Sequence, residues 1–305
     1  MKKSPKPTIT QRPLWGVFWM LVTGLCFVAV TAIVKHVGGG VPAAEAAFLR
    51  YALGLVFVIP MIRPILNAQL TRKDLALFSL RGAMQTIGVI LWFYSMTQIS
   101  IAEVTAMNYL SPVYVTIGAA LVLGERFAAR RFLAIIAALI GALIILRPGF
   151  REISSGHFAM LVTAVLFAFG YLIAKRMADV VSPVVVVGML SITVTIGLAP
   201  FAWAVWVTPT LAQLFWLFLV AVFATAGHLS MTLAFRAAPV SVTQPVTFLQ
   251  LVWATLLGVA FFEEPADSWV LLGGGIIIAA VSFISWREAV LKRRAITPPV
   301  SATKV

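Results

Sequence analysis

The sequence predicts an all-α membrane protein with ten transmembrane helices arranged as two five-helix repeats of opposite orientation. Three observations predict it: the composition, a series of long uncharged apolar runs, and an internal repeat. Of the 305 residues, 61% are hydrophobic and only 11% are charged, whereas roughly 25% of the residues in soluble domains are charged. A water-soluble core is therefore excluded, and each apolar run is a candidate membrane span.

The apolar runs have the length of transmembrane helices, which need about 20 residues. Six charge-free runs fit: residues 14–34, 82–102, 104–124, 153–174, 237–262 and 268–286. The uncharged stretch 180–235 contains two further spans, which we expect to be divided around Pro200 and Pro209. The short run 132–146 and the run 42–62, which contains Arg50, bring the number to ten.

The basic residues orient these spans, because cytoplasmic loops carry an excess of lysine and arginine. Eighteen of the 23 lysines and arginines fall on the side of the N-terminus. We therefore expect both termini to be cytoplasmic, with a leader at residues 1–13 and a basic tail at residues 287–305. The net charge of +13 follows from this topology. Because the basic clusters are short and separated, nucleic acid is not an expected partner.

An internal repeat relates the two halves of the chain. The tetrapeptide Met-Leu-Val-Thr occurs at residues 20–23 and again at 160–163, and at the same spacing Phe27 aligns with Phe167. A second alignment pairs Glu125 with Glu263. Because each repeat holds an odd number of spans, the second enters the membrane from the opposite face. We expect residues 1–148 to form the first repeat and residues 149–286 the second.

Short motifs lie at the ends of several spans. They are Ala-Glu-Val-Thr at 102–105, Ser-Pro-Val-Tyr at 111–114 and Leu-Gly-Glu-Arg at 123–126, with weaker counterparts at 238–241 and 261–264. Gln250 stands where a counterpart of Pro112 is expected. In these motifs the chain resembles the EamA family of the drug/metabolite transporter superfamily. The resemblance implies a ten-helix carrier with a central cavity, which in this family often exports amino acids, and a bacterial inner membrane location.

Polar and aromatic side chains within the apolar runs are the candidates for a solute path, because unsatisfied polar groups are costly in lipid. Many recur at spacings of three and four, which places them on shared helix faces. We expect the cavity to be lined by Gln85, Trp92, Thr105, Asn108, Tyr109, Pro112, His228, Thr247 and Gln250. Ordinary hydrogen bonding between helices is the alternative role for these residues.

Two other groups of residues have a structural interpretation. The pairs Ala137 with Gly141 and Gly275 with Ala279 are small-xxx-small patterns, which predict close helix packing. Arg50 lies inside a span, and we expect its long side chain to extend to the membrane interface. A polar path facing the guanidinium is the alternative.

These features favour a secondary carrier that works by alternating access. Small solutes and the bilayer are its expected partners, and we expect a monomer. Export of aromatic or other hydrophobic amino acids is the leading function, with nucleoside-like or cationic metabolites as the alternative. The sequence contains no phosphate-binding loop and no catalytic, metal or cofactor motif. The three histidines are far apart and Cys26 is the only cysteine, so an intramembrane enzyme is disfavoured. A sensor would be expected to carry a sizeable soluble domain.

Overall fold

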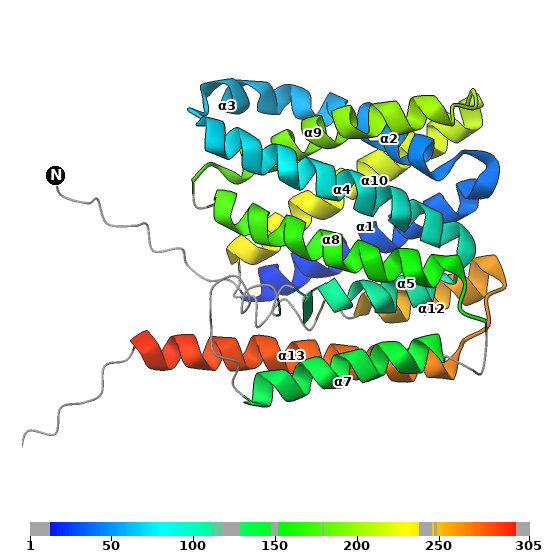
Figure 1. Cartoon of the computed structure of the whole chain (residues 1–305), viewed down its shortest axis with the longest axis vertical. Coiled ribbons are helices and arrows are strands. Elements are labelled where there is room, and N and C mark those ends of the chain that lie inside the picture. The colour runs from blue at the N-terminus through cyan, green and yellow to red at the C-terminus, as the bar shows by residue number, and fades with distance from the viewer. Residues whose placement is uncertain are drawn as a thin grey trace, which may run out of the picture.

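A computed structural model describes residues 13–111, 113–114, 117, 129–147, 152–178, 180–237, 246 and 249–296. These residues form a bundle of helices (Figure 1). The first half contains α1 (Pro13–Val37), η1 (Gly38–Gly40), α2 (Ala43–Gly54), η2 (Leu55–Met61), α3 (Ile62–Asn67), α4 (Arg72–Gln98), α5 (Ile101–Asn108) and α7 (Ala129–Leu146). The second half contains α8 (Ser155–Ala178), α9 (Pro183–Ala204), α10 (Leu211–Ala237), α12 (Leu249–Phe262) and α13 (Ser268–Ile296).

The helices match the predicted spans in number and order. Within the described residues, five segments are each long and apolar enough to cross a membrane, and four shorter apolar helices fall in α7, α8, α12 and α13. Helix α5 begins the remaining span. One end of the bundle contains the last residues of α1, α4, α7, α9 and α12. We call it the Lys35 end. Helix α1 begins and α13 finishes at the opposite end (Figure 1).

Three boundaries differ from the sequence prediction. Helix α4 begins at Arg72, ten residues before the uncharged run, because Thr71 and Asp74 form a capping box that starts the helix there. The span predicted at 42–62 is not one α-helix: it changes to a 3-10 helix after Gly54, and that segment contains Pro60, which lacks a backbone donor. Pro200 lies inside α9, whereas the break between α9 and α10 falls at residues 205–210, which include the other predicted position, Pro209.

The repeated tetrapeptide packs at equivalent places in the two halves. Helix α1 lies along α10, and in the same way α8 lies along α4. Met20 and Met160 are both almost fully buried. The hydroxyl of Thr23 is 2.9 Å from that of Ser230, while its counterpart Thr163 donates to the carbonyl of Gly88 at 3.3 Å. The first helix of each half therefore packs on the third helix of the other half.

The aligned phenylalanines occupy equivalent places in the same two contacts. A Cβ atom added to Gly227 would lie 3.1 Å from the ring of Phe27, and one added to Gly88 would lie 2.8 Å from the ring of Phe167. Each ring thus covers a glycine on the third helix of the other half. These reciprocal contacts give a physical reason for the sequence repeat, and they fit two halves inserted in opposite directions.

The pair formed by α7 and α13 lies along one side of the bundle (Figure 1). It crosses at Gly141 and Gly273, where a Cβ atom on either residue would lie 2.5–2.7 Å from the carbonyl oxygen of the other. Ile145 and Ile277 are fully buried beside this crossing. The predicted pair Gly141 and Ala137 thus has Gly141 at the contact, with Ala137 half-buried.

The packing residues expected on α13 are wrong. Gly275 and Ala279 are exposed, and nothing lies within 4 Å of a Cβ atom built on Gly275. The contact is made by Gly273 and Ile277, which face α7. The sequence alignment paired Gly141 with Ala279, but the crossing relates it to Gly273, so the register chosen for this helix rotated the wrong face inward.

Candidate functional site

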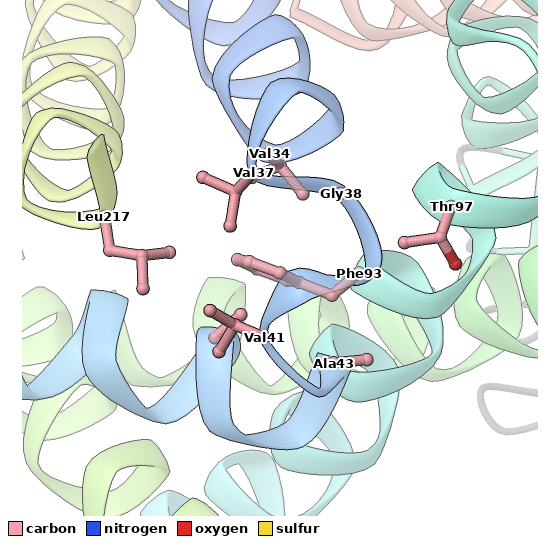
Figure 2. Close-up of a pocket in the computed structure, with 9 residues that line it drawn as sticks. Val34, Val37, Gly38, Val41, Ala43, Phe93, Thr97 and Leu217 are labelled. Carbon is pink, nitrogen blue, oxygen red and sulfur yellow. The ribbon is translucent and has the colours of Figure 1, made fainter. Parts of the chain in front are cut away.

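The interface between the two halves is closed by apolar side chains at the Lys35 end. Val34, Val37, Val41, Phe93 and Leu217 surround a space of only about 10 Å³. They come from α1, the turn before α2, α4 and α10. Figure 2 shows the ring of Phe93 extending between the valines toward Leu217. A site needs roughly 10–15 Å³ to hold one water molecule. The space between these side chains is therefore too small for a metabolite in this conformation.

Polar contacts between the halves lie beside this apolar closure. The ammonium of Lys35 on α1 forms an ion pair with Glu264, which follows α12, and also donates to the carbonyl of Ile99 at 3.1 Å. Glu264 accepts the backbone N–H of Ile101 at 3.1 Å. Because the first N–H groups of a helix have no partner within it, a carboxylate is favourable at the start of α5. Lys35 and Glu264 thus connect α1, α5 and the connection between α12 and α13.

A second set of contacts connects α5 with α8. Glu103 forms a capping box with Ser100 at the start of α5. Its other carboxylate oxygen lies 3.4 Å from Nε2 of His157, whose Nδ1 accepts the backbone N–H of Ser154 at 3.2 Å. Beside these contacts lies an open polar hollow of about 400 Å³, which is lined by Lys35, Thr97, Gln98, Ile99, Ser100, Glu103, Glu152, Ser154, His157 and Glu264.

Two further contacts hold the same end. The carboxylate of Glu45, which is fully buried in the first turn of α2, accepts the backbone N–H of Val207 at 2.9 Å. Arg147, at the end of α7, forms an ion pair with Asp267 before α13. Both join the first half to the second. At the Lys35 end, each connection with a described charged residue therefore makes a contact between the two halves.

Of the two predicted cavity residues on α4, Gln85 lies against α8. A Cβ atom on Gly170 of α8 would be 3.4 Å from the amide oxygen of Gln85. Trp92 is half-buried, and its ring centre lies 5.4 Å from that of Phe93 in an edge-on contact. Gln85 therefore faces the other half of the molecule, and Trp92 lies next to the apolar closure.

The predicted cavity residues at α5 have different surroundings. Thr105 donates to the carbonyl of Ile101 at 2.8 Å, so its hydroxyl is satisfied within its own helix. The side-chain oxygen of Asn108 is buried and has no hydrogen-bond partner in the part of the chain that the structure describes. Tyr109 forms a hydrogen bond with the backbone of Leu251 on α12. Tyr109 therefore lies where α5 meets α12.

The remaining predicted residues are spread over α10 and α12. The ring of His228 contacts that of Phe27 edge-on, with 5.2 Å between their centres. Gln250 is half-buried at the start of α12. Pro112 and Thr247 lie outside the described residues. His228 thus belongs to the contact between α1 and α10, while Asn108, Tyr109 and Gln250 belong to the α5 and α12 region.

Sequence reasoning missed the residues that close the Lys35 end. Lys35, Glu103 and Glu264 lie at predicted span ends, where charged residues are usual, so their sequence positions gave no reason to pair them. The Ser-x-x-Glu pattern at residues 100–103 is a readable helix start. It indicates where α5 begins but not its contact with His157. Phe93 was one of many apolar residues, and only the three-dimensional contacts single it out.

An inverted pair of helical repeats, with polar residues in their common interface and one end closed by contacts between them, is typical of membrane carriers. The model of the EamA-like transporter family matches residues 14–147 and again residues 154–286. The chain therefore belongs to the EamA-like transporter family, and it is an integral membrane protein with two copies of the family's module.

Several characterised proteins are similar along almost the whole chain. A riboflavin transporter of Vibrio cholerae is 27% identical over 94% of this chain and 98% of its own length. A pseudopaline exporter of Pseudomonas aeruginosa is 25% identical over 88% of this chain and 95% of its own. An S-adenosylmethionine uptake transporter of Rickettsia bellii is 25% identical over 90% and 94%.

The fold is also found in a solved crystal structure. That protein is 18% identical, with a TM-score of 0.58 over 94% of this chain and 98% of the other.

Proposed function

We propose that this protein carries small metabolites across the bacterial inner membrane by alternating access, and that it exports aromatic or other hydrophobic amino acids. The observation that carries the proposal is the closure of the Lys35 end. Phe93 and Leu217 come from different halves, as do Lys35 and Glu264. A path between the halves can open at this end only when the halves separate there, which is the motion that alternating access requires.

The orientation follows from the distribution of basic residues. Because cytoplasmic loops carry the excess of lysine and arginine, both termini are cytoplasmic and the Lys35 end faces the periplasm. The conformation with this end closed is then the one that would receive solute from the cytoplasm. For an exporter, loading takes place in this state, and release follows when the contacts of Lys35 and Phe93 break.

The solute class is supported by the residues between the halves. Trp92 and Tyr109 offer aromatic surfaces, while Asn108 has a buried oxygen able to accept a hydrogen bond. Such a set suits a solute that combines a ring with polar groups. A nucleoside-like solute is the second candidate, favoured by the similarity to transporters named for riboflavin and S-adenosylmethionine.

Solute counterflow in proteoliposomes tests this proposal. Vesicles with the purified protein, loaded with unlabelled L-phenylalanine, are expected to accumulate radiolabelled L-phenylalanine transiently, because a carrier exchanges solute without an energy source. Vesicles without protein are the control. Labelled riboflavin and adenosine are assayed in parallel. Exchange of either of these without exchange of phenylalanine would refute amino-acid export and favour the second candidate, and no exchange of any solute would contradict the carrier proposal.

A further inference from the structure

Arg50 places a positive charge near the middle of a membrane span. It is the eighth residue of α2, so it lies about 10 Å along the axis at 1.5 Å per residue. The apolar segment that contains it runs from Ala43 to Pro60, and Arg50 is near its centre. A charged side chain at this depth is costly unless it meets a partner or a polar path. The guanidinium of Arg50 therefore needs a stabilising partner or a polar environment in the folded chain.

The guanidinium of Arg50 lies over a buried ring. Its central carbon is 3.9 Å from the centre of the Tyr51 ring, and Tyr51 is only 7% exposed. Gly54, one helical turn further on the same face as Arg50, packs against Ala221 of α10. These contacts place the guanidinium toward α10 and the interface between the halves.

Acidic partners for Arg50 are lacking at this depth. Among the residues that the structure describes, the acidic ones lie at helix ends, in connections, or beyond a span: Glu45, Asp74, Glu103, Glu152, Glu263, Glu264, Asp267 and Glu288. Glu45, the acidic residue that precedes Arg50 on α2, accepts the backbone N–H of Val207 instead. Arg50 therefore carries a positive charge into the middle of this span without a described acidic group beside it.

The second half lacks this charge. Helix α9, the second helix of the second half, contains no charged residue from Pro183 to Ala204. Residues that serve the packing of the two halves, such as Thr23 and Thr163, are repeated. A residue needed only for packing would be expected in both halves. The presence of Arg50 in one half points to recognition of a solute that binds in a single orientation.

We infer that Arg50 binds the carboxylate of the transported solute. The inference rests on the proposed function and names its anionic group. A planar guanidinium binds a carboxylate through two parallel hydrogen bonds, which combine charge neutralisation with fixed geometry. The solute carboxylate would supply the negative charge that the described interior lacks. Its ring would then extend from Arg50 along the interface between the halves.

Binding of matched ligands to the purified protein tests the inference. L-Phenylalanine and L-phenylalaninamide differ only in the carboxylate. The unaltered protein is expected to bind phenylalanine at least about tenfold more tightly than the amide. In Arg50→Gln this preference is expected to disappear through weaker binding of phenylalanine, whereas Arg50→Lys keeps the charge and is expected to retain part of it. Arg72→Gln, which removes an exposed charge at the start of α4, is the matched control.

Each outcome is decisive when the fold of the variants is checked by thermal unfolding. A preference for phenylalanine that persists in Arg50→Gln would overturn the inference and leave amino-acid transport standing. An unaltered protein that binds the amide as well as the acid would also overturn it. Counterflow of riboflavin or adenosine would then still support a carrier. Should Arg50→Gln fail to fold, Arg50→Lys decides, because its loss of bidentate geometry is expected to weaken phenylalanine binding severalfold.

Discussion

The two halves of this protein share their packing residues but differ in their charged residues. Met20 and Met160 are buried at equivalent contacts, each between the first helix of one half and the third helix of the other. By contrast, Arg50 on α2 has no charged counterpart on α9, the second helix of the second half. The helix packing of the two halves is therefore nearly symmetric, whereas the distribution of charged residues is not. Asymmetric polar positions are therefore the better guide to solute chemistry.

The largest loss of stability is expected from substitutions where α7 crosses α13. A Cβ atom on Gly273 would meet the carbonyl oxygen of Gly141 at 2.5 Å, and the reverse contact would be 2.7 Å. Because a backbone atom cannot rotate away, Gly273→Ala and Gly141→Ala are each expected to lower the free energy of unfolding by about 3 kcal/mol. Thermal and denaturant unfolding in detergent measure this.

Gly275→Ala is the matched control on α13, since a Cβ atom there meets nothing within 4 Å. Its stability is expected to stay the same or to rise slightly, because alanine favours helix over glycine. A large loss in only one of the two variants, Gly141→Ala or Gly273→Ala, would show that the crossing is not symmetric.

A smaller effect is expected at the ion pair of the Lys35 end. Lys35 and Glu264 side chains are 21% and 11% exposed, between the surface and buried cases. Lys35→Glu should therefore weaken the closure by about 1–2 kcal/mol, which is about a tenfold increase in opening. The measurement is the labelling rate of Val41→Cys, introduced in a Cys26→Ala background, because Val41 is only 3% exposed when this end is closed.

The reverse change at the partner refines this test. Combining Lys35→Glu with Glu264→Lys is expected to restore part of the closure, because the ion pair returns while the hydrogen bond to the Ile99 carbonyl does not. Lys175→Glu, at the aligned position in the second half, changes the same charge near the opposite end of α8 and should leave the labelling rate unaltered. Labelling that responds equally to both single changes would contradict a local closure.

The two contacts between first and third helices allow the finest comparison. A Cβ atom would lie 2.8 Å from the Phe167 ring at Gly88 but 3.1 Å from the Phe27 ring at Gly227. Gly88→Ala is therefore expected to cost about 1–2 kcal/mol and Gly227→Ala less than about 1 kcal/mol in the same unfolding assay. Gly24→Ala, which meets nothing within 4 Å, is the control. Equal losses would mean that the two contacts adapt equally.

The sequence predicted the number of spans, their order and the inverted repeat, because length, hydropathy and repetition are local properties of the chain. It misplaced the start of α4, because a buried Arg81 interrupts the apolar pattern without ending the helix. It misassigned the packing face of α13, because each residue turns a helix by about 100°, so that Gly275 and Gly273 point to nearly opposite sides. The rotation of Gly275 away from α7 can be seen only in the folded chain.

Prediction of the site was less complete for a similar reason. Polar residues inside apolar runs, such as Asn108, are visible in the sequence, and their depth marks them as candidates. Contacts such as Lys35 with Glu264 join residues far apart in the chain. Each of these lies at a helix end, where charge is ordinary. The role of such a residue then depends on its burial and on its contact partner, and neither can be read from the neighbouring sequence.

The reciprocal contacts of α1 with α10 and of α8 with α4 bear on how such a chain could have arisen. Met20 and Thr23 are covered by the other half, so one half inserted alone would leave them against lipid. An ancestor with a single five-helix unit would have been complete only as a pair of identical chains, one inserted each way. Fusion of two such units in one polypeptide would fix the antiparallel pair and leave each copy free to diverge.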